Sequence, residues 1–152
     1  MAESLEATPK FNQAAYARVP HKLPAPTDCR FCCSPVSFCN NAELYGKSYG
    51  DWPYGYFCGF CQAYVGCHPG TDLPLGTMAT WGLRKKRSAA HQAFDPLWRS
   101  RRVSRTKAYK LLAQEMGIPH SDCHISWFEA EQCDEVVRIA AILNKRYGVG
   151  NG

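Results

Sequence analysis

The chain has 152 residues, of which 45% are hydrophobic and 12% aromatic, and it carries a formal net charge of +5 at pH 7. This length fits one domain, or one small module with a helical partner, and the composition excludes a wholly disordered protein. No apolar run approaches the roughly 20 residues of a membrane-spanning helix, and the N-terminal residues lack the basic and apolar regions of a secretory signal. We therefore expect a cytoplasmic protein with no membrane partner, whose nine cysteines are metal ligands and buried thiols rather than disulfides.

Prolines divide the N-terminal part of the chain. Proline disfavours helix and favours extended backbone, and residues 1–27 contain four of them, at Pro9, Pro20, Pro24 and Pro26. We predict that residues 1–27 form a flexible segment, with one short helix over residues 11–19 before an extended linker.

Two Cys-x-x-Cys pairs organise residues 28–76. Cys29 pairs with Cys32, and Cys58 pairs with Cys61. Two intervening residues let both thiolates of a pair hold one ion, and two such pairs supply the four sulfurs of a tetrahedral Zn²⁺ site. The 25 residues between the pairs exceed the commonest spacing, and turn-forming Asn, Gly and Ser residues take up the extra length. We predict one structural zinc ion bound by these four cysteines.

Short β-prone pieces bounded by Gly, Pro, Asn and Asp surround the two pairs. We predict strands at residues 36–38, 42–45, 54–57 and 63–67. This order of knuckles and hairpins is typical of a zinc ribbon. The module has few large apolar residues, and a structural zinc contributes about 10–16 kcal/mol of apparent binding free energy, enough to supply what the small core lacks. Alternative ligands that would replace one member of the quartet are Cys33, Cys39, Cys67 and His68.

A helical subdomain is predicted over residues 77–148, with residues 149–152 as a tail. Helical spacing of apolar residues predicts helices over residues 80–94, 104–116 and 126–147, with a short turn from Asp95 to Trp98 between the first two. The predicted fold class is therefore α+β, with the zinc ribbon packed on the C-terminal helices.

Capping residues mark the ends of these helices. Ser104 is a natural N-cap, and Gly117 stops the helix that follows it. Ser126 and Glu129 have the spacing of a capping box for the last helix, which Gly148 closes. We predict that the two cysteines in this region, Cys123 and Cys133, are buried thiols.

Positive charge is concentrated between Trp81 and Lys110, where ten Lys or Arg residues stand against one acid, Asp95, a formal charge of +9. Such a local field attracts polyanions, and an exposed aromatic among the cations would stack on unpaired bases. The alternative is a solvated surface that only keeps the protein soluble. We predict a nucleic-acid-binding face, with DNA favoured over RNA, formed by Arg84, Lys85, Lys86, Arg87, Arg99, Arg101, Arg102, Arg105 and Lys107.

Several motifs occur together in one order along the chain. They are Cys29-x-x-Cys32, Cys58-x-x-Cys61-x-Ala63-Tyr64-Val65-Gly66, Pro74-Leu75-Gly76-Thr77, Arg87-x-x-Ala90-His91-x-x-Phe94-Asp95-x-Leu97-Trp98, Ser104-Arg105-x-x-Ala108-Tyr109 and Cys123-His124-Ile125. Over residues 28–137 the chain resembles a family of short zinc-finger-containing proteins of unassigned function encoded by bacteriophages and prophages. The resemblance implies zinc at the two Cys-x-x-Cys pairs and a phage or bacterial cytosolic setting, and it implies no established activity.

Three functions compete. The prediction we favour is non-enzymatic nucleic-acid binding with a structural zinc. The second is an adaptor or inhibitor that binds a host bacterial protein, for instance an RNA polymerase subunit or a defence nuclease, because zinc ribbons also dock proteins. The third is a small metal-dependent nuclease, which requires His91, Asp95 and His124 to converge on a metal. The alternative to that third possibility is that His91 caps the helix or packs against Phe94 and Trp98, with a hydrogen bond to Asp95.

Overall fold

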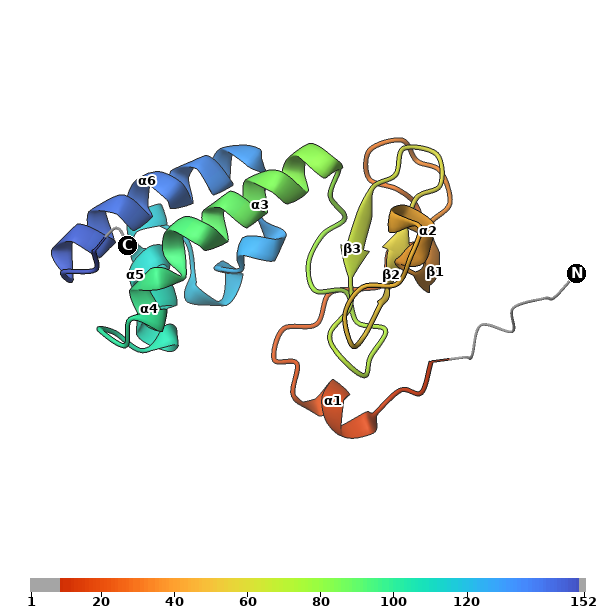
Figure 1. The fold of residues 1–152 in the computed structure, drawn as a ribbon, viewed down its shortest axis with the longest axis horizontal. Helices are drawn as coiled ribbons and strands as arrows, with labels where there is room; N and C mark the ends of the chain where they lie inside the picture. The colour runs from red at the N-terminus through yellow and green to blue at the C-terminus, as the bar shows by residue number, and fades with distance from the viewer. Residues whose placement is uncertain (1–8, 151–152) are drawn as a thin grey trace, which may run out of the picture.

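The computed structural model describes residues 9–150, which form a β-lobe followed by a lobe of packed helices (Figure 1). Residues 1–8 of the predicted N-terminal segment and residues 151–152 of the predicted tail lie outside the described part. The predicted α+β class, with a zinc-ribbon-like sheet beside C-terminal helices, is confirmed. Within residues 9–150, no helix combines the length and the apolar composition needed to cross a membrane.

The N-terminal segment contacts the β-lobe through a short helix, α1 (Gln13–Ala17). The side chain of Asn12 caps this helix by accepting a hydrogen bond from the backbone N–H of Ala14 (2.9 Å). Tyr16 donates a hydrogen bond from its hydroxyl to the Asp72 carboxylate (2.7 Å), and Ala15 is buried. The predicted helix over residues 11–19 is therefore present and slightly shorter.

Three antiparallel strands form the sheet, in the order β1 (Ser37–Asn40), β2 (Tyr54–Phe57) and β3 (Tyr64–Gly66). In the central strand, Tyr56 lies opposite Phe38 on one side and Val65 on the other. Aromatic and β-branched residues suit such a pleated, half-buried surface, which is why three of the four predicted strands are found close to their predicted positions.

The strand predicted at residues 42–45 is wrong, because this stretch forms a short helix, α2 (Ala42–Tyr45). The Asn40 side chain accepts a hydrogen bond from the Ala42 backbone N–H (2.9 Å), which caps the start. Gly46 ends the helix with φ 82°, in the left-handed region that glycine adopts without strain. Local capping thus outweighed the β propensity of the stretch.

The helical lobe contains α3 (Trp81–Phe94), α4 (Pro96–Arg99), α5 (Arg105–Met116) and α6 (Ala130–Arg146), with two 3₁₀ turns, η1 (His120–Asp122) and η2 (Ile125–Trp127), between α5 and α6. Helices α3 and α6 lie side by side along the length of the lobe (Figure 1). Thr80 caps α3, and Ser104 caps α5 as predicted, by accepting a hydrogen bond from the backbone N–H of Lys107 (3.1 Å).

The start of the last helix differs from the prediction. Helix α6 begins at Ala130, and Ser126 belongs to η2 instead of the capping box. The capping box is formed by Glu129 and Gln132, each of whose side chains accepts a hydrogen bond from the backbone N–H of the other. The same three-residue spacing occurs twice in the sequence, so spacing alone does not distinguish the two boxes.

Each lobe has its own core. Phe94, Leu112, Phe128 and Leu143 are fully buried in the helical lobe, together with many other apolar side chains. The predicted buried thiols, Cys123 and Cys133, are 3% and 0% exposed and belong to this core. The core of the β-lobe is smaller and is built around the cysteines of the two pairs.

Arg87 joins the two lobes. It lies in α3 and is 8% exposed. Its guanidinium donates hydrogen bonds to the Thr77 carbonyl (2.8 Å), the Thr77 hydroxyl (2.6 Å) and the Phe128 carbonyl (3.0 Å). Burial lowers the pKa of Arg87, and the three oxygen acceptors replace the water that the guanidinium has lost.

Candidate metal centre and basic surface

The four cysteines of the two Cys-x-x-Cys pairs meet at one point of the β-lobe. The sulfurs of Cys29 and Cys61 are 3.4 Å apart, those of Cys32 and Cys58 are 3.5 Å apart, and all four lie within 4.8 Å of one another. A tetrahedral zinc with Zn–S bonds of about 2.3 Å holds its sulfurs about 3.8 Å apart, so the spacing suits this ion. Among residues 9–150, no other group of three or more His, Cys, Asp or Glu side chains is so close.

The two knuckles share one backbone geometry. In the first, the N–H of Cys33 donates to the Cys29 carbonyl (2.8 Å), and in the second, the N–H of Gln62 donates to the Cys58 carbonyl (2.8 Å). Cys33 and Gln62 each have φ 64°, a left-handed conformation in residues other than glycine. Such strain persists where the surrounding structure requires it, and here it turns each chain so that both thiols of a pair face one point.

The four thiols do not ionise independently. Hydrogen bonds from the Ser34 side chain and backbone, with smaller ones from neighbouring thiols, lower the pKa of Cys32 to about 6. For Cys61, the backbone N–H of Ala63 lowers the pKa, but burial and hydrogen bonds with the other thiols outweigh it and raise the value to about 12. The Cys32 thiolate therefore forms readily, whereas the Cys61 thiolate forms with difficulty. A divalent cation bound among the four sulfurs would stabilise both thiolates.

The alternative ligands lie outside this group. Cys33 is exposed on the surface of the first knuckle. Cys67 is buried, and its burial raises the pKa of the thiol to about 12. His68 lines a cavity at the junction of the lobes, and neither it nor Cys39 is among the four clustered side chains.

The fold and this site define a small zinc-ribbon-type protein. Residues 25–142 match the family model of the zinc-finger-containing domain DUF3268, which covers more than half of the chain, and the chain belongs to this family. Comparison with curated proteins and with solved structures found no match. Family and geometry agree on a Cys₄ group compatible with Zn²⁺.

The cations of the predicted basic face form two clusters at opposite ends of α3, a helix about 20 Å long. At the start of α3 lies a proximal cluster of Arg84, Lys85 and Lys86. Beyond its end, on α4, α5 and the turn between them, lies a distal cluster of Arg99, Arg101, Arg102, Arg105 and Lys107.

Contacts within the protein occupy most of the proximal cluster. Arg84 donates to the Ala79 carbonyl (2.7 Å), and Lys86 forms an ion pair with Asp134 (2.7 Å). Lys85 lies 4.3 Å from the ring centre of Trp81, an indole that is 67% exposed. The prediction that Arg87 belongs to a nucleic-acid-binding face was wrong. Its guanidinium is buried and donates hydrogen bonds to Thr77 and Phe128.

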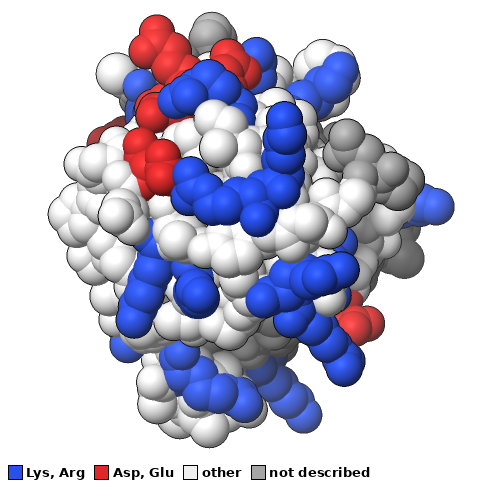
Figure 2. Space-filling model, turned by 90° about the vertical axis from the view of Figure 1, so that its left-hand side faces the viewer, with Lys and Arg blue, Asp and Glu red and all other residues white. Residues whose placement is uncertain are grey.

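The distal cluster is exposed and has few acidic neighbours. Among the described residues, Arg99 is its only member within 4 Å of a carboxylate, at 3.7 Å from Asp95. That carboxylate is itself buried, with the residue 7% exposed. Figure 2 looks at the helical lobe from this side and shows Lys and Arg side chains in several groups across the face, with most Asp and Glu side chains gathered near one edge.

His91 and Asp95 lie together, as the metal-dependent nuclease hypothesis requires of these two residues. The Nδ1 atom of His91 is 3.2 Å from the Asp95 carboxylate, which also accepts a hydrogen bond from the Trp98 indole (3.2 Å). His124 instead donates from Nε2 to the Ser121 carbonyl (3.0 Å) and packs against Trp127. Within residues 9–150, His91, Asp95 and His124 do not form a metal-binding group.

Proposed function

We propose that this protein binds nucleic acid through the distal cluster, while one structural Zn²⁺ holds the β-lobe together. The observation that carries the proposal is the set of exposed cations on α4 and α5 that the protein's own carboxylates leave almost unpaired. The proposal includes the bacteriophage and bacterial cytosolic setting that the sequence resemblance implies, and it favours DNA over RNA.

A structural role for the zinc follows from its ligands. Four cysteine sulfurs complete a tetrahedral shell, whereas a catalytic zinc keeps one position open for water or substrate. Two of the four cysteines, Cys29 and Cys58, are also buried. Because the β-lobe core is small, the binding free energy of the ion would supply much of its stability.

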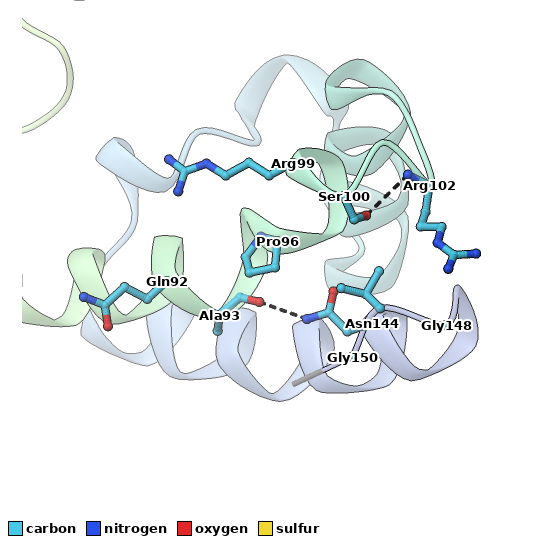
Figure 3. Close-up of a pocket in the computed structure, with 10 residues that line it drawn as sticks. Gln92, Ala93, Pro96, Arg99, Ser100, Arg102, Asn144, Gly148 and Gly150 are labelled. Atoms are coloured by element: carbon cyan, nitrogen blue, oxygen red, sulfur yellow. Dashed lines mark hydrogen bonds between the residues drawn. The ribbon is translucent and has the colours of Figure 1, made fainter. Parts of the chain in front are cut away.

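A surface hollow that could hold part of a nucleic-acid strand lies beside the distal cluster. The hollow has a volume of about 760 Å³ and lies between the end of α3, α4 and the C-terminal end of α6. In Figure 3, Arg99 and Arg102 extend on different sides of it, and Asn144 donates a hydrogen bond to the Ala93 carbonyl (3.0 Å) between them. Guanidinium groups on either side of an open hollow suit an extended chain of phosphates.

The proximal cluster would contribute stacking more than charge. Trp81 is exposed and Lys85 lies over its ring, an arrangement able to take up an unpaired base. The other aromatics of this region are less accessible, since Trp98 is half-buried and Tyr109 is 8% exposed.

Binding to labelled single- and double-stranded DNA and RNA across a salt series tests the proposal. Five phosphate contacts to duplex DNA predict a slope of about −4.5 for log K against log salt. The double variant Arg101→Gln/Arg102→Gln should bind more weakly and reduce the slope by about 2 units. The matched control, Lys85→Gln/Lys86→Gln, removes the same charge from the proximal cluster and should leave the slope nearly unchanged.

Equal losses in both double variants would show that only net charge attracts the polyanion. Binding confined to low salt would also overturn the proposal. The expected result is micromolar or tighter binding at physiological salt, with the slope sensitive to the distal pair alone.

A second candidate, an adaptor for a host bacterial protein such as an RNA polymerase or a defence nuclease, is favoured by the knuckle tips. Phe60 and Phe31 are 80% and 43% exposed there. Affinity capture from a bacterial lysate at high salt tests it. Retention of one partner by the wild-type protein and its loss with Phe60→Ser would support the adaptor, and identical capture by both would argue against it.

A further inference from the structure

All five histidines of the chain line one cavity. The cavity has a volume of about 350 Å³ and lies where the N-terminal segment, the β-lobe and the helical lobe meet. Its histidines come from separate parts of the sequence, and Arg105 of α5 adds a guanidinium to the same wall. They are His21, His68, His91, His120 and His124.

The described residues of the lining supply donors and positive charge but no carboxylate. No Asp or Glu is among the described residues that line the cavity. Hydroxyl groups of Thr106 and Tyr109 add to the imidazoles and the guanidinium, whereas the Ser126 hydroxyl already donates to the Leu75 carbonyl (2.7 Å). Burial raises the pKa of Tyr109 to about 12, so its phenol keeps its proton and remains a donor at neutral pH. Such a composition suits an anion with several oxygen acceptors.

His91 is oriented for this role. Its Nδ1 lies 3.2 Å from the Asp95 carboxylate, so the other ring nitrogen, Nε2, remains for a ligand. The contact with Asp95 fixes the orientation of the imidazole, so that Nε2 points away from the carboxylate. The carboxylate is held by the Trp98 indole and lies outside the lining, so it does not repel an anion in the cavity directly.

A transition metal is the other ligand that histidines suggest, and the geometry disfavours it. In the described part of the chain, the four cysteines already have metal-ligand spacing, whereas the histidine nitrogens do not come within 4.8 Å of one another in any group of three. A phosphate needs no such convergence, because its oxygens reach donors spread around a larger space. Arg105 also favours an anion over a cation.

We propose that this cavity binds a phosphate group of a nucleotide, with His91 and Arg105 as its principal donors. The phosphate belongs either to a free mononucleotide or to the phosphorylated end of a nucleic-acid strand. The cavity and the distal cluster share only Arg105, so this site and the nucleic-acid-binding surface fail separately.

The test is a titration of the zinc-loaded full chain followed by the imidazole ¹H–¹⁵N signals of the histidines. The probes are inorganic phosphate, a nucleoside 5′-monophosphate and the same nucleoside without phosphate. We expect the two phosphates to shift signals of several histidines at sub-millimolar to millimolar concentration and the nucleoside to shift none.

Variants locate the site. His91→Gln and Arg105→Gln should each weaken monophosphate binding at least tenfold. The matched control Lys110→Gln removes an exposed cation from the same helix, outside both the cavity lining and the distal cluster, and should change binding less than twofold. Helix content from circular dichroism verifies that each variant is folded, and Arg105 is exposed, so its replacement leaves the core intact.

Strand ends distinguish the two sources of phosphate. Tenfold tighter binding of a 5′-phosphorylated oligonucleotide than of its 5′-hydroxyl form assigns the cavity to strand ends, and binding of the monophosphate alone assigns it to free nucleotides. Absence of phosphate-dependent shifts, or equal affinity in His91→Gln and wild type, would overturn the proposal. Histidine shifts caused by a second equivalent of Zn²⁺ without phosphate would replace it with a metal site.

Discussion

Replacing Arg87 tests whether one buried side chain holds the two lobes together. Methionine has a similar length and lacks the guanidinium, so Arg87→Met removes three hydrogen bonds and leaves most of the packing in place. The substitution leaves the Thr77 and Phe128 carbonyls without their donor. It also removes the junction between the loop before α3 and the turn before α6.

The expected cost follows from the two acceptors left behind. An unsatisfied buried acceptor costs about 1–3 kcal/mol, and water reaches the half-buried Thr77 more easily than the fully buried Phe128. The substitution also removes the desolvation cost of a buried charge, which offsets part of this loss. We expect a net loss of about 3 kcal/mol of unfolding free energy, which corresponds to a fall in Tm of about 6–12 °C for a chain of this size.

Thermal unfolding at saturating zinc, followed by circular dichroism, measures this loss. The control Lys85→Met changes an exposed residue of the same helix and should alter stability by less than about 0.5 kcal/mol. A Tm for Arg87→Met within about 2 °C of this control would refute the assignment of Arg87 to the lobe junction. Folded Arg87→Met, measured well below its Tm, should bind nucleic acid as the wild type does, because its guanidinium is inside.

Three further predictions follow from the metal centre and the junction. Chelation should release one zinc per chain, measured with a colorimetric indicator. It should unfold the β-lobe while the far-ultraviolet helix signal persists, since the helical lobe has a separate core. Loss of β-lobe structure and helix signal together would contradict this separation. Zinc binding displaces thiol protons, so the apparent zinc affinity should depend on pH. Chelator competition should show a fall of at least tenfold from pH 8 to pH 7, because Cys61 has a pKa of about 12 and holds its proton throughout, and a steeper fall below about pH 6, where Cys32 is also protonated. A pH-independent affinity would exclude these ligands. Gly76→Ala places a Cβ 1.9 Å from the Ser126 carbonyl oxygen and should lower the unfolding free energy, measured with denaturant, by at least about 1–3 kcal/mol. The control Gly82→Ala, whose Cβ has nothing within 4 Å, should be neutral or stabilising by up to about 1 kcal/mol. Equal effects would show that the lobes are not in close contact at Gly76.

Local chemistry made much of the fold predictable. Two Cys-x-x-Cys pairs place thiols at metal-ligand spacing because each knuckle is only a few residues long. Ser104 and Gly117 delimit α5 by capping groups within one turn of its ends. The errors are also local: at α2 capping outweighed the β propensity of the stretch, and the start of α6 depended on which of two capping boxes the backbone used.

The sequence by itself determined the cysteine quartet, the helical periods and the excess of positive charge, all of which depend on neighbours along the chain. Tertiary structure alone decided which cations stay exposed. Arg87 directly follows the exposed Lys86 in the same basic run, yet packing against another element buries it. It also brought together five histidines spread from position 21 to position 124, with no short spacing common to them all. Their meeting depends on how two lobes and an N-terminal segment pack, and packing of distant segments leaves no periodic trace in the sequence.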